Sequence, residues 1–154
     1  GVRPVRAAAA SAWAEAAVSA AAAVFAAAVM FFALIMYIFA AGFKTAVVTN
    51  KMQDAAVDIV RGFFGDSIHV IIGQVDGVAQ KPEPDGVWLA LDKLGVSRDR
   101  AVYVGDSEVD CMTAHNSKLP CIGVTWGFRG RKVLEDNGAE FIVSDPKEIL
   151  DIIK

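Results

Sequence analysis

From residue 44 to the C-terminus, short apolar runs alternate with segments whose apolar residues recur at helical spacing. The apolar runs predict strands at residues 44–48, 68–72, 101–104, 121–124 and 141–143. The segments between them predict helices at residues 52–63, 87–94, 109–118, 131–137 and 146–153. This alternation predicts an α/β fold, in which a Rossmann-like parallel sheet is covered by helices on both faces.

Residues 1–43 do not follow this pattern. They are rich in alanine, contain only three charged side chains, and have none between residues 16 and 43. We expect residues 1–41 to form an apolar helical segment or a partial cap, and residues 42–154 to form the core domain. Three interpretations of the apolar run stay open: a transmembrane helix, which needs about 20 apolar residues, a pair of buried helices, or alanines that stand for side chains nobody identified.

The position of Gly42 disfavours the membrane interpretation. This glycine is predicted to follow the end of a helix, and a strand begins almost at once with KTAVVTN. That spacing leaves no linker between a bilayer and a strand inside a sheet. The run is also too long for a signal peptide and shows no clear cleavage context.

The overall charge excludes one class of partner. The chain of 154 residues carries a formal net charge of −3, so it offers no basic excess for binding nucleic acid. Its two cysteines, Cys111 and Cys121, are too far apart for a CxxC pair, and we expect both to be reduced thiols in a cytoplasmic protein. The sequence does not indicate an oligomeric state.

Candidate functional residues follow the predicted strands, because ligands of parallel sheets bind at the carboxyl ends of strands. Thr49 and Asn50 follow the first strand, where a hydroxyl and backbone N–H groups suit a phosphate. The alternative is that they only cap the next helix. Lys81 is a lone cation in the loop QKPEPDG, and the alternative for it is a solvated surface lysine.

An acidic pair follows another strand. Asp106 comes after Gly105, which lets the chain turn and leaves room beside the carboxylate, and Asp110 returns to the same side one helical turn later. Two carboxylates at one strand end suit Mg²⁺, and the alternative is helix capping. A hydroxyl, a lysine and an acidic pair together supply the hydrogen bonds, positive charge and metal site that a phosphoryl group requires.

The order and surroundings of these residues resemble the haloacid dehalogenase superfamily. AVVTNK, QKPEPDG and YVGDSEVD resemble its second, third and fourth motifs. The segments GVTWGFR and GAEFIVSDPKEIL look like its phosphoglycolate phosphatase branch. The resemblance covers roughly 110 residues, and the linkage of several motifs makes it specific.

The resemblance implies a magnesium-dependent phosphomonoester phosphatase that acts on a small phosphorylated metabolite through a phospho-aspartyl intermediate. Thr49, Asn50 and Lys81 would then bind the phosphate, and Lys81 would also neutralise charge on the nucleophile. Asp106 would bind Mg²⁺. Asp110 would hold the water shell of the metal or orient Lys81.

The chain departs from the family at the first motif, an apolar strand followed by Asp-x-Asp. No Asp-x-Asp occurs in the sequence, and residues 1–43 contain no aspartate. The residues before Thr49 are also too few for a first strand and a full helical cap. The alternative function is therefore a non-catalytic pseudo-phosphatase, or a membrane-tethered binding module, on the same core. A response-regulator-like receiver fits less well, because its acidic pair precedes its Thr and Lys.

Overall fold

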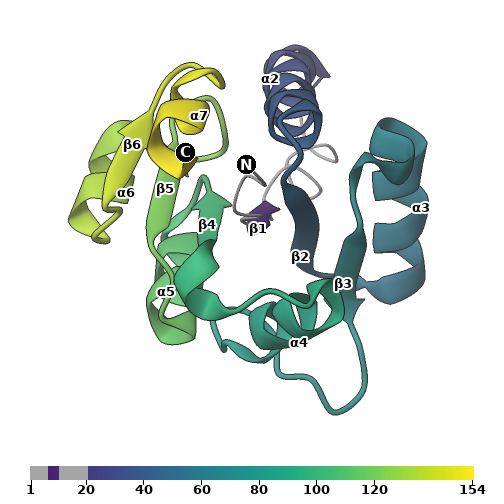
Figure 1. Ribbon diagram of the computed structural model, residues 1–154. Coiled ribbons are helices and arrows are strands. Elements are labelled where there is room, and N and C mark those ends of the chain that lie inside the picture. The colour runs from purple at the N-terminus through teal and green to yellow at the C-terminus, as the bar shows by residue number, and fades with distance from the viewer. Residues whose placement is uncertain (1–6, 11–20) are drawn as a thin grey trace.

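The computed structural model describes residues 7–10 and 21–154, with side chains from Phe25 onward. Its centre is a sheet of six parallel strands in the order β3-β2-β1-β4-β5-β6 (Figure 1). The strands are β1 (Ala7–Ala10), β2 (Lys44–Met52), β3 (Val70–Gln74), β4 (Ala101–Gly105), β5 (Cys121–Val124) and β6 (Phe141–Val143). The predicted α/β architecture with a parallel sheet is confirmed.

Helices cover both faces of this sheet. They are α2 (Ala21–Ala40), α3 (Gln53–Phe64), α4 (Asp85–Leu94), α5 (Glu108–Ser117), α6 (Arg131–Asp136) and α7 (Glu148–Ile153). Short 3₁₀ turns lie at Gly65–Ser67 and Arg98–Arg100. Side chains of α2, α3 and α7 share one apolar core with the sheet, and side chains of α4, α5 and α6 share a second. The molecule is therefore a three-layer sandwich, with its strand ends left for function.

The sequence predicts a helical segment over residues 1–41, but the structure contains a strand within it. Ala7–Ala10 forms β1, the strand that pairs with both β2 and β4. Alanine favours helices in isolation, but two neighbouring strands supply backbone hydrogen bonds that override this preference. The sheet thus extends across the domain boundary expected at residue 42, and a cap formed by residues 1–41 stays a prediction.

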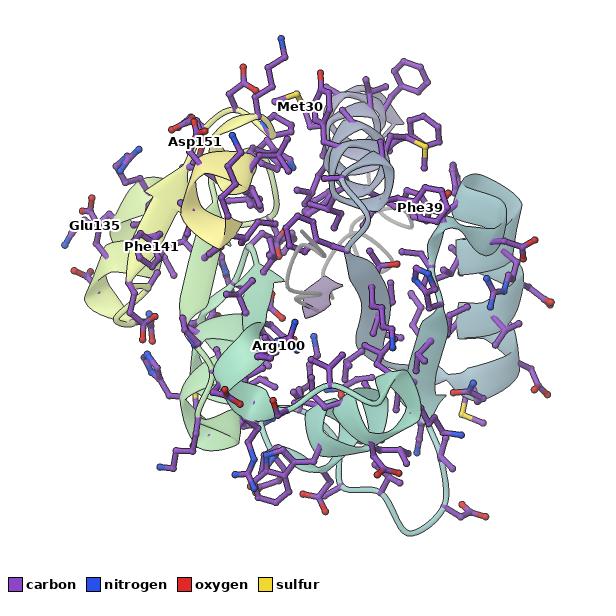
Figure 2. All side chains as sticks on the ribbon, in the orientation of Figure 1. Met30, Phe39, Arg100, Glu135, Phe141 and Asp151 are labelled. Carbon is purple, nitrogen blue, oxygen red and sulfur yellow. The ribbon has the colours of Figure 1, made fainter. Side chains whose placement is uncertain are left out.

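Helix α2 is only partly buried. Phe31, Leu34 and Ile38 are enclosed in the core. Phe32 and Phe39 stay partly exposed, although the ring of Phe32 stacks on Phe64 and the ring of Phe39, labelled in Figure 2, lies 5.9 Å from that of His69. In the part of the chain that the structure describes, no helix is both long enough and apolar enough to cross a membrane.

Strand β2 continues beyond its predicted end. It reaches Met52, and its pairing with β3 shifts register between Val48 and Met52. Thr49 and Asn50 therefore lie within the last part of the strand and do not cap α3. The residue at the cap position is Met52, whose side chain makes no capping hydrogen bond.

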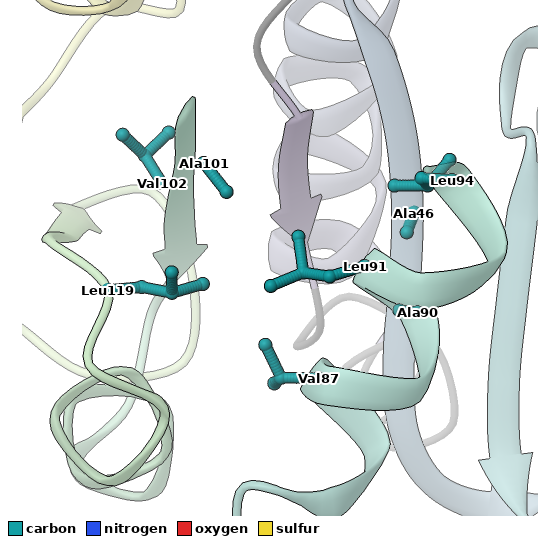
Figure 3. A pocket seen from close by; sticks show the side chains of 8 residues that line it. All are labelled: Ala46, Val87, Ala90, Leu91, Leu94, Ala101, Val102 and Leu119. Carbon is teal, nitrogen blue, oxygen red and sulfur yellow. The ribbon is translucent and has the colours of Figure 1, made fainter. Parts of the chain in front are cut away.

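A small gap lies between α4 and the sheet. Its volume is about 10 Å³, and its lining is entirely apolar (Figure 3): Ala46, Val87, Ala90, Leu91, Leu94, Ala101, Val102 and Leu119. A space of this size holds about one water-sized sphere, and none of the described side chains that line it is polar. It is therefore too small for a phosphorylated ligand.

Candidate active site

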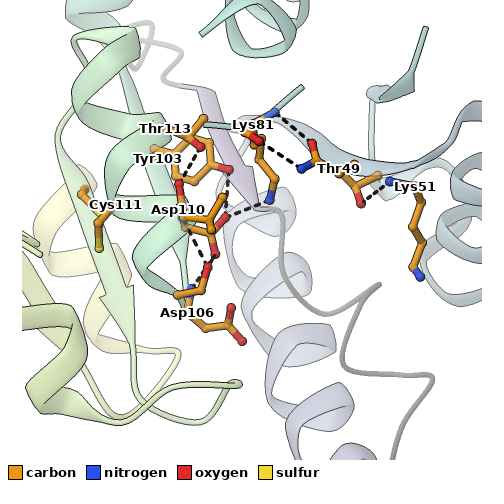
Figure 4. Close-up of polar contacts among 12 residues, drawn as sticks. Thr49, Lys51, Lys81, Tyr103, Asp106, Asp110, Cys111 and Thr113 are labelled. Atoms are coloured by element: carbon orange, nitrogen blue, oxygen red, sulfur yellow. Dashed lines mark hydrogen bonds and ion pairs between the residues drawn. The ribbon is translucent and has the colours of Figure 1, made fainter. Parts of the chain in front are cut away.

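The order of the strands brings the predicted site residues together. Strands β2 and β4 flank β1, and Ala10 of β1 pairs with Val47 on one side and Val104 on the other. Thr49 and Asp106 each lie two residues beyond these partners, so they occupy the same edge of the sheet. Figure 4 shows Lys81 and Asp110 between them, linked by dashed contacts. The residues that directly follow β1 lie outside the described residues.

Lys81 is a buried residue and not the solvated lysine of the alternative interpretation. Its side chain is only 4% exposed, and its Nζ donates to Asp110 Oδ1 at 3.0 Å. The side-chain amide of Asn50 fixes the backbone of Lys81 in two directions. Asn50 Oδ1 accepts from Lys81 N at 2.9 Å, and Asn50 Nδ2 donates to Lys81 O at 3.1 Å. Asn50 therefore positions Lys81. This role differs from the direct contact with phosphate that the sequence predicts for Asn50.

Both oxygens of Asp110 receive hydrogen bonds from the protein. Oδ1 accepts from Tyr103 OH at 3.1 Å as well as from Lys81, and Oδ2 accepts from Asp106 N at 3.1 Å and from Ser107 Oγ at 2.8 Å. Four donors around one carboxylate favour the second of the two roles expected for Asp110, the orientation of Lys81, over the first, which was to hold the water shell of the metal.

Asp106 has the opposite environment. Its Oδ2 accepts from the backbone N–H of Phe128, whereas its Oδ1 is buried and has no hydrogen-bond partner among the described residues. Burial, and then the charge of Asp110, raise the pKa of Asp106 to about 7. A buried carboxylate oxygen without a donor is a group that a cation would satisfy.

A magnesium ion fits this site by the chemistry of its donors. The described residues hold no cluster of three or more His, Cys, Asp or Glu side chains. Mg²⁺ does not need one, because it keeps several waters and is commonly bound by one or two carboxylates together with phosphate oxygens. Asp106 Oδ1 is the protein oxygen best suited to it here.

Two glycines make room for the acidic pair. A Cβ atom on Gly105 would collide with the Cβ of Asp110, and one on Gly127 would collide with the carboxylate of Asp106. The space that Gly105 leaves therefore lies beside Asp110, whereas the prediction placed it beside the carboxylate of Asp106. Gly127 leaves the space beside Asp106, from the loop after β5.

Thr49 lies at the end of the sheet with 3% of its surface exposed. Its Oγ1 accepts a hydrogen bond from Lys51 N at 3.3 Å. Because a hydroxyl group has one donor of its own, the O–H of Thr49 can still donate to a phosphate oxygen.

Three contributors to the site were not identified from the sequence: Tyr103, Ser107 and Phe128. Ser107 had a readable signal, since Ser107 and Asp110 have the spacing of an N-terminal capping box, and Ser107 does cap α5. Tyr103 belongs to an apolar strand, and Phe128 acts through its backbone N–H. Neither feature can be recognised from the sequence of residue types.

An open cavity adjoins the site. It has a volume of about 180 Å³, enough for a small ligand, and it is lined by Asn50, Lys81, Ser107, Glu108, Val109, Phe128 and Arg129. The only residues shared with the phosphate-binding set are Asn50 and Lys81. A ligand with its phosphate beside Lys81 would therefore place the rest of its atoms in this cavity.

Comparison with known proteins relates these features to one family. Residues 30–124 match the model of the family described as haloacid dehalogenase-like hydrolase. A phosphoglycolate phosphatase from Yersinia pseudotuberculosis is 30% identical over 115 residues, which cover 74% of this chain and 50% of the relative. A protein provisionally named pyrophosphatase PpaX, from Caldanaerobacter subterraneus, is 34% identical over 114 residues, or 73% of this chain and 52% of the relative.

A solved structure agrees with these matches. A protein from Lactobacillus delbrueckii subsp. bulgaricus, provisionally named a phosphoglycolate phosphatase, superposes with a TM-score of 0.75 and 38% sequence identity. The match covers 79% of this chain and 51% of that one. The chain thus spans about half the length of the relatives it matches.

Proposed function

Since this chain belongs to the haloacid dehalogenase-like hydrolase family, we propose that it carries the phosphate- and metal-binding half of a magnesium-dependent phosphomonoester phosphatase. The observation that supports this most directly is the contrast between the two aspartates. Asp110 accepts from four donors and holds Lys81, while Asp106 keeps one buried oxygen that has no partner among the described residues. A phosphatase needs this division, with one group that orients a cation and another that binds a metal.

Each residue has a defined task in this proposal. The hydroxyl of Thr49 donates to a phosphate oxygen, and Lys81 neutralises negative charge on the phosphoryl group. Asn50 keeps the backbone of Lys81 in place. Asp106 would hold Mg²⁺, which, when bound, withdraws charge from the phosphoryl oxygens. Asp110 fixes the ammonium group of Lys81 in a direction that serves the phosphate.

We propose a small phosphorylated metabolite as the ligand, in a phosphoglycolate phosphatase-like manner. The adjoining cavity of about 180 Å³ is consistent with a compact leaving group. The names of the relatives point the same way, because phosphoglycolate and pyrophosphate both join a phosphoryl group to a small anion. We place the protein in the cytoplasm, where its free thiols Cys111 and Cys121 would stay reduced.

The second candidate function is phosphate binding without turnover. The mechanism implied by the family passes through a phospho-aspartyl intermediate, and residues 1–43 supply no aspartate to form it. Among the described residues, the hydrogen bond of Thr49 Oγ1 is with the backbone N–H of Lys51 and not with a base that could activate it. Lys81 is paired with Asp110. This second candidate is a pseudo-phosphatase that binds phosphate and Mg²⁺ together without turnover.

Calorimetric titration with inorganic phosphate tests the site that both functions share. We expect binding that requires Mg²⁺, that is abolished by Asp106→Asn, and that weakens at least roughly tenfold in Lys81→Met, as for a lost charged hydrogen bond. Lys132→Met is the matched control, because Lys132 is a solvated lysine whose partner among the described residues is Asp136. Phosphate binding that needs neither Mg²⁺ nor Asp106 would refute the proposal.

A further inference from the structure

The wall of the open cavity contains a second cation besides Lys81. Arg129 lines the cavity, and 44% of its side chain is exposed, compared with 4% for Lys81. Of the seven lining residues, only these two carry positive charge. A ligand in the cavity would meet a buried ammonium group at the phosphate end and an accessible guanidinium group nearer the solvent.

Arg129 is held in place from three sides. Its backbone N donates to Asp106 O at 3.1 Å, which ties it to the metal-binding residue. Its Nε and Nη2 donate to the two carboxylate oxygens of Glu108 at 3.0 and 2.9 Å. Its Cζ lies 4.9 Å from the ring centre of Phe128. A guanidinium group fixed in this way loses little conformational entropy when it binds a ligand.

The contacts with Glu108 leave donors to spare. A guanidinium group carries five N–H bonds, and the two hydrogen bonds to Glu108 use two of them. The remaining three form part of a planar fork, which matches the geometry of a carboxylate or phosphate better than a lysine does. Glu108 thus orients Arg129 and leaves three of its N–H donors available to a ligand.

We propose that Arg129 selects ligands whose leaving group carries a second anionic group, such as a carboxylate or a phosphate. This inference rests on the proposed function, since Lys81 and the metal must take the phosphoryl end. The second anion then needs its own cation, and Arg129 is the one that the cavity provides. An uncharged leaving group gains nothing from Arg129, so the residue discriminates between two classes of ester.

Glu108 requires a particular design of variant. Removal of Arg129 alone would expose the negative charge of Glu108, and this charge would repel an anion even if Arg129 never touched it. The double variant Glu108→Gln/Arg129→Gln removes both charges. It separates direct recognition by Arg129 from mere neutralisation of Glu108.

The test is calorimetric titration of the protein with 2-phosphoglycolate and with ethyl phosphate, both in the presence of Mg²⁺. The two esters have leaving groups of similar size, but only the first has a carboxylate. We expect 2-phosphoglycolate to bind roughly tenfold more tightly, as for a charged hydrogen bond, and the double variant to reduce this ratio to near unity with ethyl phosphate unaffected. Arg131→Gln is the matched control, because Arg131 forms an exposed pair with Glu135 within the described part of the chain and should keep the full ratio.

Equal affinities for the two esters in the unmutated protein would overturn the inference and leave the phosphate site intact. Discrimination that survives in the double variant would also overturn it, because Arg129 would then act only through Glu108. Failure of both esters to bind would refute the proposed function, and the inference with it.

Discussion

Lys81 Nζ lies 3.0 Å from Asp110 Oδ1, and the two side chains are only 4% and 0% exposed. The pair connects the loop before α4 to the first turn of α5, so it joins segments that approach the active site from different strands. Because both charges are buried, their mutual attraction must offset the free energy that each loses on leaving water. The catalytic lysine expected from the sequence is therefore also a structural residue.

The first prediction concerns stability. Lys81→Met should lower the free energy of unfolding by roughly 3 kcal/mol, because it leaves the buried carboxylate of Asp110 without its counter-ion. Urea denaturation would measure the change. Lys132→Met, at an exposed i,i+4 pair, should stay within about 0.5 kcal/mol of the unmutated protein. Equal losses in the two variants would show that the Lys81–Asp110 pair does not stabilise the fold.

The burial of Lys81 illustrates what the sequence could not provide. Its neighbours in QKPEPDG are polar, and the partner that buries it lies 29 residues away. By contrast, the strands Cys121–Val124 and Phe141–Val143 were predicted with the bounds that they have, because each is a local apolar run. Local patterns predicted every strand of the sheet except β1, together with the order of the motifs, whereas the division of roles between Asp106 and Asp110 depends on contacts from Tyr103 and Phe128.

The second prediction concerns pH and Asp106 in metal-free protein. The pKa of Asp106 is raised from 3.8 to about 7 by burial and by Asp110. Since the folded state then holds this proton more tightly than the unfolded state, the stability due to the protonated form is lost as pH rises from about 4 to about 7. Asp106→Asn, which carries no charge, should therefore be more stable than the unmutated protein at pH 8 by on the order of 2–4 kcal/mol.

Thermal unfolding in a metal chelator at pH 5 and pH 8 would measure this difference, which should be much smaller at the lower pH. Added Mg²⁺ should raise the melting temperature of the unmutated protein at pH 8 through binding linkage, and it should not affect Asp106→Asn. A variant that is less stable than the unmutated protein at pH 8 without metal would contradict the assignment of Asp106 as a desolvated carboxylate.

The third prediction uses two glycines of one loop. Gly127→Ala should weaken Mg²⁺-dependent phosphate binding at least roughly tenfold, because its Cβ would displace the carboxylate of Asp106. Gly130→Ala is the control, since a Cβ there meets no atom within 4 Å. Calorimetric titration of both variants with phosphate and Mg²⁺ would measure the difference. Unchanged phosphate affinity in Gly127→Ala would show that Asp106 can move without loss of the site.

The fourth prediction is that a protein with this literal sequence does not hydrolyse phosphomonoesters. Thr49, Lys81 and Asp106 can position phosphate and metal, but none of them replaces an aspartate nucleophile. Turnover of p-nitrophenyl phosphate and 2-phosphoglycolate with Mg²⁺ should stay at background. Robust Mg²⁺-dependent turnover that is lost on Asp106→Asn would mean that another carboxylate acts as the nucleophile.

The central position of β1 in the sheet affects how the site forms during folding. Thr49 and Lys81 belong to the half of the sheet formed by β2 and β3, whereas Asp106 and Asp110 belong to the half that starts at β4. Among the described strands, only β1 pairs with both halves, and it does so between residues that are almost a hundred positions apart, Ala7 and Ala101. Pairing between such distant residues is intrinsically slow, because loop closure must precede it. A partly folded chain would therefore hold two incomplete half-sites, and tight binding of phosphate with Mg²⁺ would report that the whole sheet has assembled.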